Sequence, residues 1–153
     1  MKKYMAFFLV LICVLGFSGC TSEEAVHIDF PFAVEDVENI EMYHYVDVPV
    51  SAEKKMVVAE EDIKSLYDMF EELSLEEKTV EETTGAAVTS FRFNLSDGSE
   101  YGLVYVGCGV KNGILKSTTG NFEYFTSADI GWNWKGLNEE LEAVPVEESE
   151  LPQ

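Results

Sequence analysis

The sequence has 153 residues, of which 46% are hydrophobic and 12% aromatic, enough for one small domain with an apolar core. Its 29 acidic residues outnumber 10 basic ones, which gives a formal net charge of −19 at pH 7. A surface this negative repels nucleic acid and anionic lipid, so we expect no nucleic-acid partner.

The N-terminal residues have the pattern of a secretion signal. Residues 1–3 include two lysines, and residues 4–17 are apolar apart from Gly16. As a helix this run would be about 21 Å long, which is shorter than the roughly 30 Å hydrocarbon core of a bilayer. We therefore predict that residues 1–19 are a cleaved signal peptide, with an uncleaved membrane anchor as the alternative.

The signal ends in Phe17-Ser18-Gly19-Cys20, which resembles the lipobox of bacterial lipoproteins. In that family a small residue precedes the cysteine, a diacylglycerol is attached to its thiol, and a peptidase cleaves just before it. Ser18 and Gly19 match this pattern, whereas Phe17 replaces the usual leucine. The resemblance implies lipidation at Cys20, a lipidated tether over residues 20–27, and anchoring to the outer face of the cytoplasmic membrane. In a Gram-negative cell it would imply the periplasmic face of a membrane instead.

Processing at this site would leave a more acidic chain without an internal disulfide. Loss of Lys2 and Lys3 would change the formal charge from −19 to −21. Cys13 would leave with the signal and Cys20 would carry the lipid, so Cys108 would be the one cysteine left. We expect the exported domain to depend on packing for its stability.

The first half of the mature chain predicts two strands and a helix. The alternation of apolar and polar residues over 37–50 predicts a half-buried strand, and residues 54–58 predict a second. Residues 60–73 predict the main helix, because acidic residues crowd its first turn and apolar residues recur at helical spacing. Those apolar residues are Ile63, Leu66, Tyr67, Phe70 and Leu73.

Hairpin signals divide the second half into short strands. Asp97-Gly98 and Asn112-Gly113 are residue pairs typical of tight turns between antiparallel strands. Hairpin-linked strands disfavour a parallel nucleotide-binding sheet, which needs crossover connections. The expected strands are residues 90–95, 101–110, 114–117 and 121–126.

The C-terminal residues predict a second helix and a tail. Leu137, Leu141 and Val144 have helical spacing, which predicts a C-terminal helix over 134–144, and residues 146–153 predict a disordered acidic tail. We therefore expect a single α+β domain over residues 28–145. Its architecture would be one antiparallel sheet of about five to six strands, with the main helix packed on one face.

Two side chains with reactive groups are expected to be structural. Cys108 shares a strand face with Val104 and Val106, so we expect a buried, inert thiol rather than a nucleophile. His44 follows Met42 on the apolar face of the first strand, and we expect a hydrogen-bonded histidine at the core or its rim. A metal site or a general base would need partners that the sequence does not identify.

Oxygen-rich segments are interpreted as turns and solvated surface. Residues 94–100 lack the twelve-residue ligand pattern of a calcium loop, and their composition is what a hairpin turn requires. The acidic pairs between residues 71 and 82 are typical of a solvated face, with a cation site as the minor alternative. We therefore expect no metal and no cofactor.

An aromatic cluster in the second half is the remaining candidate for a binding surface. In a small domain such rings usually belong to the core, but exposed rings often mark binding sites and could stack on sugars. We predict that Trp132, Trp134 and Tyr124 form the binding surface. The cluster consists of Tyr101, Tyr105, Phe122, Tyr124, Phe125, Trp132 and Trp134.

Over its whole length the chain resembles short, uncharacterised lipoproteins of Gram-positive bacteria, a family without an assigned activity. The sequence contains no catalytic motif, which favours a non-enzymatic module that binds a protein or cell-wall ligand at the cell surface. The alternative is a small surface hydrolase that uses His44 and scattered acids, or an accessory subunit of an envelope enzyme or transporter. A pocket lined by His44 and carboxylates would favour the enzyme, whereas an exposed aromatic or acidic surface would favour the binder.

Overall fold

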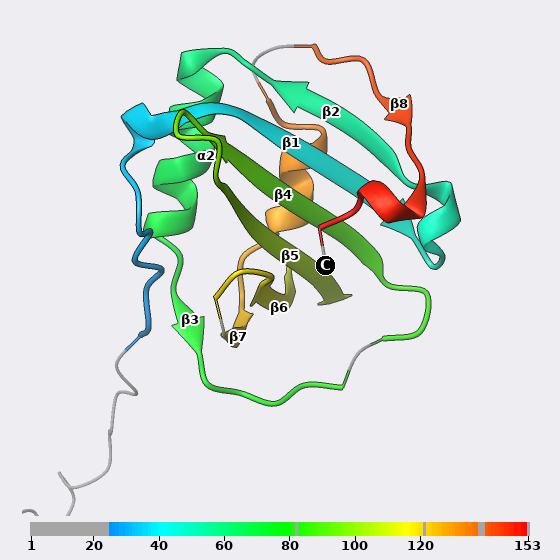
Figure 1. Ribbon diagram of the computed structural model, residues 1–153. Coiled ribbons are helices and arrows are strands. Elements are labelled where there is room, and N and C mark those ends of the chain that lie inside the picture. The colour runs from blue at the N-terminus through cyan, green and yellow to red at the C-terminus, as the bar shows by residue number, and fades with distance from the viewer. Residues whose placement is uncertain (1–24, 82, 121, 138–139, 153) are drawn as a thin grey trace, which may run out of the picture.

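A computed structural model describes residues 25–81, 83–120, 122–137 and 140–152 (Figure 1). The predicted signal peptide and the residues that resemble a lipobox, with Cys20, lie outside these residues. The described chain forms one antiparallel sheet with an α-helix against one face. None of the helices it contains has the length and apolar character needed to cross a membrane.

Eight strands form the sheet in the described part of the chain. Across the sheet their order is β3-β7-β6-β5-β4-β1-β2-β8, and all neighbours are antiparallel. The strands are β1 (Val37–Val46), β2 (Glu53–Val57), β3 (Leu75–Glu76), β4 (Ala87–Leu95), β5 (Glu100–Gly109), β6 (Asn112–Ser117), β7 (Glu123–Thr126) and β8 (Val144–Pro145). Short 3-10 helices are η1 (Val34–Asp36), η2 (Pro49–Ser51), η3 (Ile130–Trp134) and η4 (Glu148–Glu150).

One α-helix, α2 (Glu60–Glu71), packs its apolar side against the sheet (Figure 1). Glu60, Glu61 and Asp62 occupy its first turn, where their charges face the positive end of the helix dipole. The helix ends two residues before the predicted end at residue 73, and Leu73 is buried just beyond it. We call the sheet face on the side opposite α2 the outer face.

Aromatic rings fill the space between α2 and the sheet. Phe70 of α2 meets Phe91 of β4 edge to face, with ring centroids 4.9 Å apart. Phe30, which precedes η1, stacks on Tyr67 at 4.8 Å and lies 5.5 Å from Tyr101. All five rings are buried, and removing one such ring from a core typically costs about 3–5 kcal/mol. The segment before η1 is therefore part of the domain and not only a tether.

The predicted count of five to six strands is wrong, because the sheet has eight. The edge strands β3 and β8 account for the difference. β3 pairs with β7 through Leu75 and Glu76, and β8 pairs with β2 through Val144 and Pro145. Each has only two residues, so neither has an alternating pattern that a sequence can show.

The predicted C-terminal helix over residues 134–144 is also wrong. η3 ends at Trp134, the described residues between it and β8 are not helical, and β8 begins at Val144. Gly136 lies just after η3, where an added Cβ would be 2.8 Å from the indole nitrogen of Trp132. A short helix is marginal unless it buries an apolar face, and three spaced apolar residues do not provide one.

The C-terminal residues also differ from the disordered tail predicted for 146–153. The Val146 amide donates to the Ala52 carbonyl at 3.1 Å, and residues 148–150 form η4. Arg92 donates to the Glu150 carbonyl at 2.6 Å. The described part of the tail therefore lies along the outer face, with the sheet between it and α2 (Figure 1).

Cys108 is only half-buried, so its predicted full burial in the core is wrong. Leu103 and Tyr105 of β5 are buried against the core and Val104 and Val106 alternate with them, but the pairing of β5 with β6 shifts register between Gly107 and Gly109, around Cys108. The thiol-bearing residue and the two valines are half-buried. The error arises because both faces of β5 are apolar, so alternation alone does not say which face meets the helix.

The two hairpin glycines have different roles. Gly98 has a φ of 84° in the turn between β4 and β5, as the Asp97-Gly98 pair predicts. The next turn, at Val110 and Lys111, lies two residues earlier than predicted, and its left-handed residue is Lys111, with a φ of 59°. Gly113 lies within β6, where an added Cβ would overlap the Val106 carbonyl oxygen. Its role is therefore close packing.

Candidate functional site

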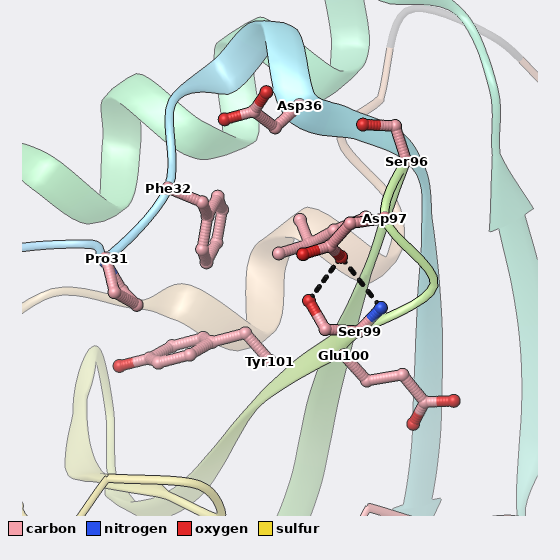
Figure 2. Close-up of a pocket in the computed structure, with 9 residues that line it drawn as sticks. Pro31, Phe32, Asp36, Ser96, Asp97, Ser99, Glu100 and Tyr101 are labelled. Carbon is pink, nitrogen blue, oxygen red and sulfur yellow. Dashed lines mark hydrogen bonds between the residues drawn. The ribbon is translucent and has the colours of Figure 1, made fainter.

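Two adjoining cavities lie near the end of the sheet where β4 turns into β5. The larger, which we call the aromatic groove, has a volume of about 560 Å³. The smaller, which we call the turn pocket, has a volume of about 360 Å³ and lies against the β4–β5 turn (Figure 2). Pro31, Glu100 and Tyr101 line both cavities, so the two share a wall.

Rings from two strands distant in the sequence line the aromatic groove. Tyr101 lies near the start of β5, and Tyr124 lies in β7, two strands away across the sheet. Tyr124 is paired with Leu115, a fully buried residue of β6, so its ring is on the core-facing side. Phe122 stacks on Tyr124, with centroids 5.5 Å apart and 22° between the ring planes. Both residues are half-buried.

The segment that leads from the tether forms the other wall of the groove. Val26 makes an isolated bridge with Leu75 of β3, through backbone hydrogen bonds of 3.0 and 2.9 Å. Ile28 is buried behind this wall, whereas His27 and Asp29 are exposed at the groove. The groove is therefore assembled from the start of the domain and from three strands.

Figure 2 shows Phe32 and Tyr101 on one side of the turn pocket, with Asp36 and the β4–β5 turn on the other. The two ring centroids are 5.5 Å apart. Asp97 accepts hydrogen bonds from the Ser99 hydroxyl at 2.6 Å and from the Ser99 amide at 2.8 Å. These bonds hold the pKa of Asp97 below its usual value, so its carboxylate is charged at neutral pH.

Both cavities carry negative charge. Asp29 lines the groove, Asp36 and Asp97 line the turn pocket, and none of the described lining residues is lysine or arginine. Glu100 lines both cavities, but its carboxylate points away from the turn pocket (Figure 2) and pairs with Arg92 at 3.3 Å. Ring faces beside carboxylates suit a ligand that has an apolar face and hydrogen-bond donors, and they repel anions.

The structure brings one of the three predicted binding residues to these cavities. Tyr124 lines the groove, whereas Trp132 and Trp134 line neither cavity. Trp134 is only 7% exposed, and Trp132 is 65% exposed in η3. The prediction missed the groove role of Phe122 and Tyr101, because their proximity depends on the strand order and not on sequence spacing.

His44 lies apart from both cavities, at the rim of the core. Its Nδ1 is 3.0 Å from the Thr89 hydroxyl, and its ring stacks on Trp134 with centroids 5.3 Å apart. Burial, reinforced by the charge of Lys135, lowers the pKa of His44, so the ring is neutral at pH 7. The pocket of His44 and carboxylates that would favour a hydrolase is therefore not formed by either cavity.

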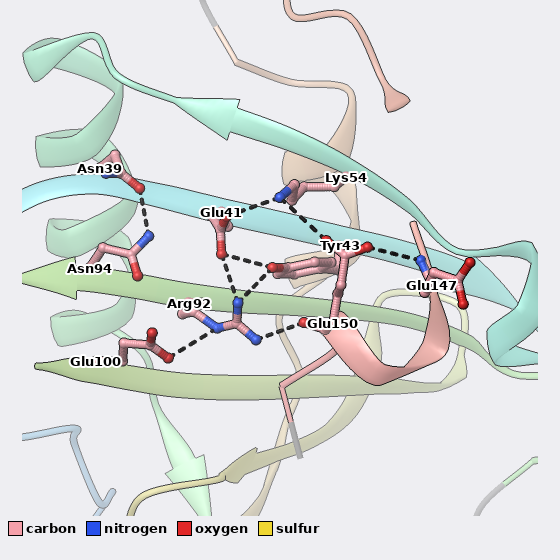
Figure 3. Close-up of polar contacts among 9 residues, drawn as sticks. All are labelled: Asn39, Glu41, Tyr43, Lys54, Arg92, Asn94, Glu100, Glu147 and Glu150. Atoms are coloured by element: carbon pink, nitrogen blue, oxygen red, sulfur yellow. Dashed lines mark hydrogen bonds and ion pairs between the residues drawn. The ribbon is translucent and has the colours of Figure 1, made fainter. Parts of the chain in front are cut away.

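A second polar cluster lies on the outer face, between β1, β2, β4 and the tail (Figure 3). The Tyr43 hydroxyl donates to the Glu41 carboxylate at 2.7 Å. Lys54 and Arg92 donate to the same carboxylate at 3.1 and 2.9 Å. Burial raises the pKa of Glu41, but these bonds and the two positive charges outweigh it and lower the pKa. Because the charges satisfy one another, we interpret the cluster as a structural fastening for the tail.

Within the described residues no group of three or more histidine, cysteine, aspartate or glutamate side chains is arranged to hold a metal ion. Residues 94–100 form a hairpin turn in which the Ser99 amide donates a hydrogen bond to a carboxylate oxygen of Asp97. Comparisons of this chain with protein-family models, with curated proteins and with solved structures found no match.

Proposed function

We propose that this chain is a lipid-anchored, non-enzymatic binding module that holds a cell-wall saccharide in the aromatic groove. The observation that supports this most directly is the stacked Phe122–Tyr124 pair, which lies with Tyr101 in a cavity of about 560 Å³. That volume falls within the range of small-molecule sites, about 300–1,000 Å³. Sugar rings have apolar faces that stack on aromatic side chains, and sugar hydroxyls donate hydrogen bonds to carboxylates.

The position of the groove relative to the expected anchor supports the same proposal. Val26 lines the groove and is fixed to Leu75 of β3. Cys20 precedes Val26 by six residues, a length of chain that spans at most about 21 Å when fully extended. A lipid on Cys20 would therefore keep the groove close to the membrane surface, where a surface-anchored module meets the inner side of the wall.

The bonds already made by the carboxylates favour binding over catalysis. Asp97 is held by Ser99, and Glu100 is paired with Arg92. A general acid or base needs a carboxyl that is placed to exchange a proton with the substrate. Carboxylates fixed in this way suit the recognition of hydrogen-bond donors.

Saccharide titration tests the proposal. We expect N-acetylglucosamine oligomers to bind saturably to the full-length lipoprotein in neutral detergent, as measured by calorimetry. Tyr124→Leu keeps apolar volume but removes the ring face, so affinity should fall about twofold to tenfold, since stacking of one ring contributes roughly 0.5–1.5 kcal/mol. Trp132→Ala, at an exposed ring outside the groove, is the matched control and should bind as the wild type does. Saccharide binding that is equally strong in all three proteins would contradict the proposed site.

The anchor is tested separately. Wild-type protein expressed in bacteria should partition into the detergent phase, and Cys20→Ala should move to the aqueous phase because it has no thiol to lipidate. Equal partitioning of the two proteins would contradict lipidation and favour an uncleaved helix.

A further inference from the structure

We infer, on the basis of the function proposed above, that the aromatic groove and the turn pocket together select ligands with a free, positively charged amino group over neutral ligands of the same shape. The ligand class is an amino sugar with an unsubstituted amine, or another primary amine attached to a ring or short chain. Carboxylates and ring faces recognise an ammonium group in the same way whichever wall component carries it.

The first support is the charge that surrounds the shared wall of Pro31 and Tyr101. Asp29 lies on the groove side of that wall, and Asp36 and Asp97 lie on the pocket side. Among the described residues that line the two cavities, no lysine or arginine offsets these carboxylates. Concave surfaces lined by one sign of charge concentrate ligands of the opposite sign.

The second support is that the negative charge is fixed at neutral pH. Asp97 is held in its ionised form by two hydrogen bonds from Ser99. Asp36 accepts a hydrogen bond from the Ala33 amide at 3.1 Å, which fixes the carboxylate at the edge of the turn pocket. The carboxylates of Asp36 and Asp97 are thus held in place by hydrogen bonds within η1 and the folded turn.

The third support is the chemistry of the rings. An ammonium group is attracted to the face of a tyrosine or phenylalanine ring, and this attraction adds to that of nearby carboxylates. Phe122 and Tyr124 present a stacked pair of such rings beside Asp29. The same molecule already places Lys78 over the Phe125 ring at 4.4 Å and Lys55 over the Trp134 ring at 4.7 Å. A neutral sugar would gain the stacking alone, whereas an amino sugar would gain both contributions.

A pair of oligosaccharides that differ only at nitrogen tests the inference. Glucosamine tetramer and N-acetylglucosamine tetramer have the same ring skeleton, but only the first carries ammonium groups near neutral pH. With the full-length lipoprotein in neutral detergent, we expect the amine form to bind about tenfold more tightly at low ionic strength. The ratio should fall below about threefold at roughly 0.5 M salt, because salt screens the carboxylates.

Matched charge variants separate a local effect from the charge of the whole chain. The double variant Asp29→Asn/Asp36→Asn should abolish most of the preference for the amine form. The control Asp47→Asn/Glu81→Gln removes the same amount of charge from exposed residues outside both cavities and should keep the preference. Asp47 has a φ of 68°, a conformation that asparagine also adopts, so the control should fold normally.

The outcomes distinguish this inference from the proposed function. Equal affinity for the two tetramers, with both lost in Tyr124→Leu, would overturn the amine preference and leave the saccharide groove standing. Failure of both tetramers to bind would overturn the two proposals together. A third outcome is an amine preference that persists in Asp29→Asn/Asp36→Asn or that falls equally in the control Asp47→Asn/Glu81→Gln. Either result would show attraction by the overall negative charge and would overturn the inference.

Discussion

Glu41→Gln should destabilise the domain by about 2–3 kcal/mol at pH 7. The Glu41 side chain is 12% exposed and accepts three hydrogen bonds, two of them from Lys54 and Arg92, which are 20% and 21% exposed. Charge-assisted bonds contribute about 1.5–3 kcal/mol each, and neutral ones about 1 kcal/mol. Glutamine keeps an acceptor oxygen, so the neutral bond from Tyr43 survives in part. Lys54 and Arg92 lose their least exposed counter-charge, but they keep the exposed partners Glu150 and Glu100, which limits the penalty.

Urea unfolding followed by tryptophan fluorescence measures this loss, and its pH dependence tests the cause. The pKa of Glu41 in the folded chain is below the ordinary value of 4.5. Its contribution is therefore present above pH 4.5 and is lost as the pH falls through the lowered value. The difference between wild type and variant should therefore shrink as the pH falls below 4.5 and through this lowered value. Glu38→Gln, at an exposed position of the same strand, should stay within about 0.5 kcal/mol of wild type. A difference that is absent at pH 7, or unchanged at acid pH, would refute the reasoning.

Three further outcomes follow from the fold. Cys108 should react with a thiol reagent in the folded domain, because the residue is only half-buried at an irregularity of β5; labelling that requires denaturant would contradict this partial exposure. Gly113→Ala should lower stability by about 1–3 kcal/mol in thermal melts, since its Cβ would overlap the Val106 carbonyl, whereas Gly107→Ala meets its nearest atom only at 3.4 Å and should be mild. Burial, with the charge of Asp129, raises the pKa of Tyr105 to about 12. In an absorbance titration Tyr105→Phe should therefore remove a tyrosine that ionises near pH 12, and the stability that the neutral ring contributes should be lost as the pH rises above 10.

The parts of the fold that could be predicted are those in which one strand or helix carries its own pattern. Residues 60–73 show helical spacing because a single face of α2 is buried. The turn at Asp97-Gly98 is predictable because Gly98 has a left-handed φ. β3 and β8 could not be predicted, because two-residue strands are defined by their neighbours. The face of β5 that meets the core could not be predicted, because both faces of this strand are apolar.

The groove could be predicted only as a cluster of aromatic residues. Tyr101 and Tyr124 are 23 positions apart, and only the β7-β6-β5 order brings them to one margin of the sheet. Trp132 and Trp134 are large and flanked by glycines, which favours a prediction that they are exposed binding residues. Trp134 instead stacks on His44 at the rim of the core. Exposure depends on which segments cover a ring, and that information is not local to the ring.

The contrast between the two polar regions of the sheet explains why a ligand site is proposed at one and not at the other. On the outer face, Glu41 is matched by Arg92 and Lys54, and the tail closes over them through Glu150. Incoming charge there would have to displace bonds that the chain already makes. At the groove, Val26 and Leu75 bridge the wall to β3, and none of the described residues that line the groove beside Asp29 is lysine or arginine. Such a wall can adjust to a ligand at little cost, because few backbone hydrogen bonds fix it. The charge of Asp29 and this bridged wall therefore lie together beside the expected lipid anchor, where a surface module would first meet its ligand.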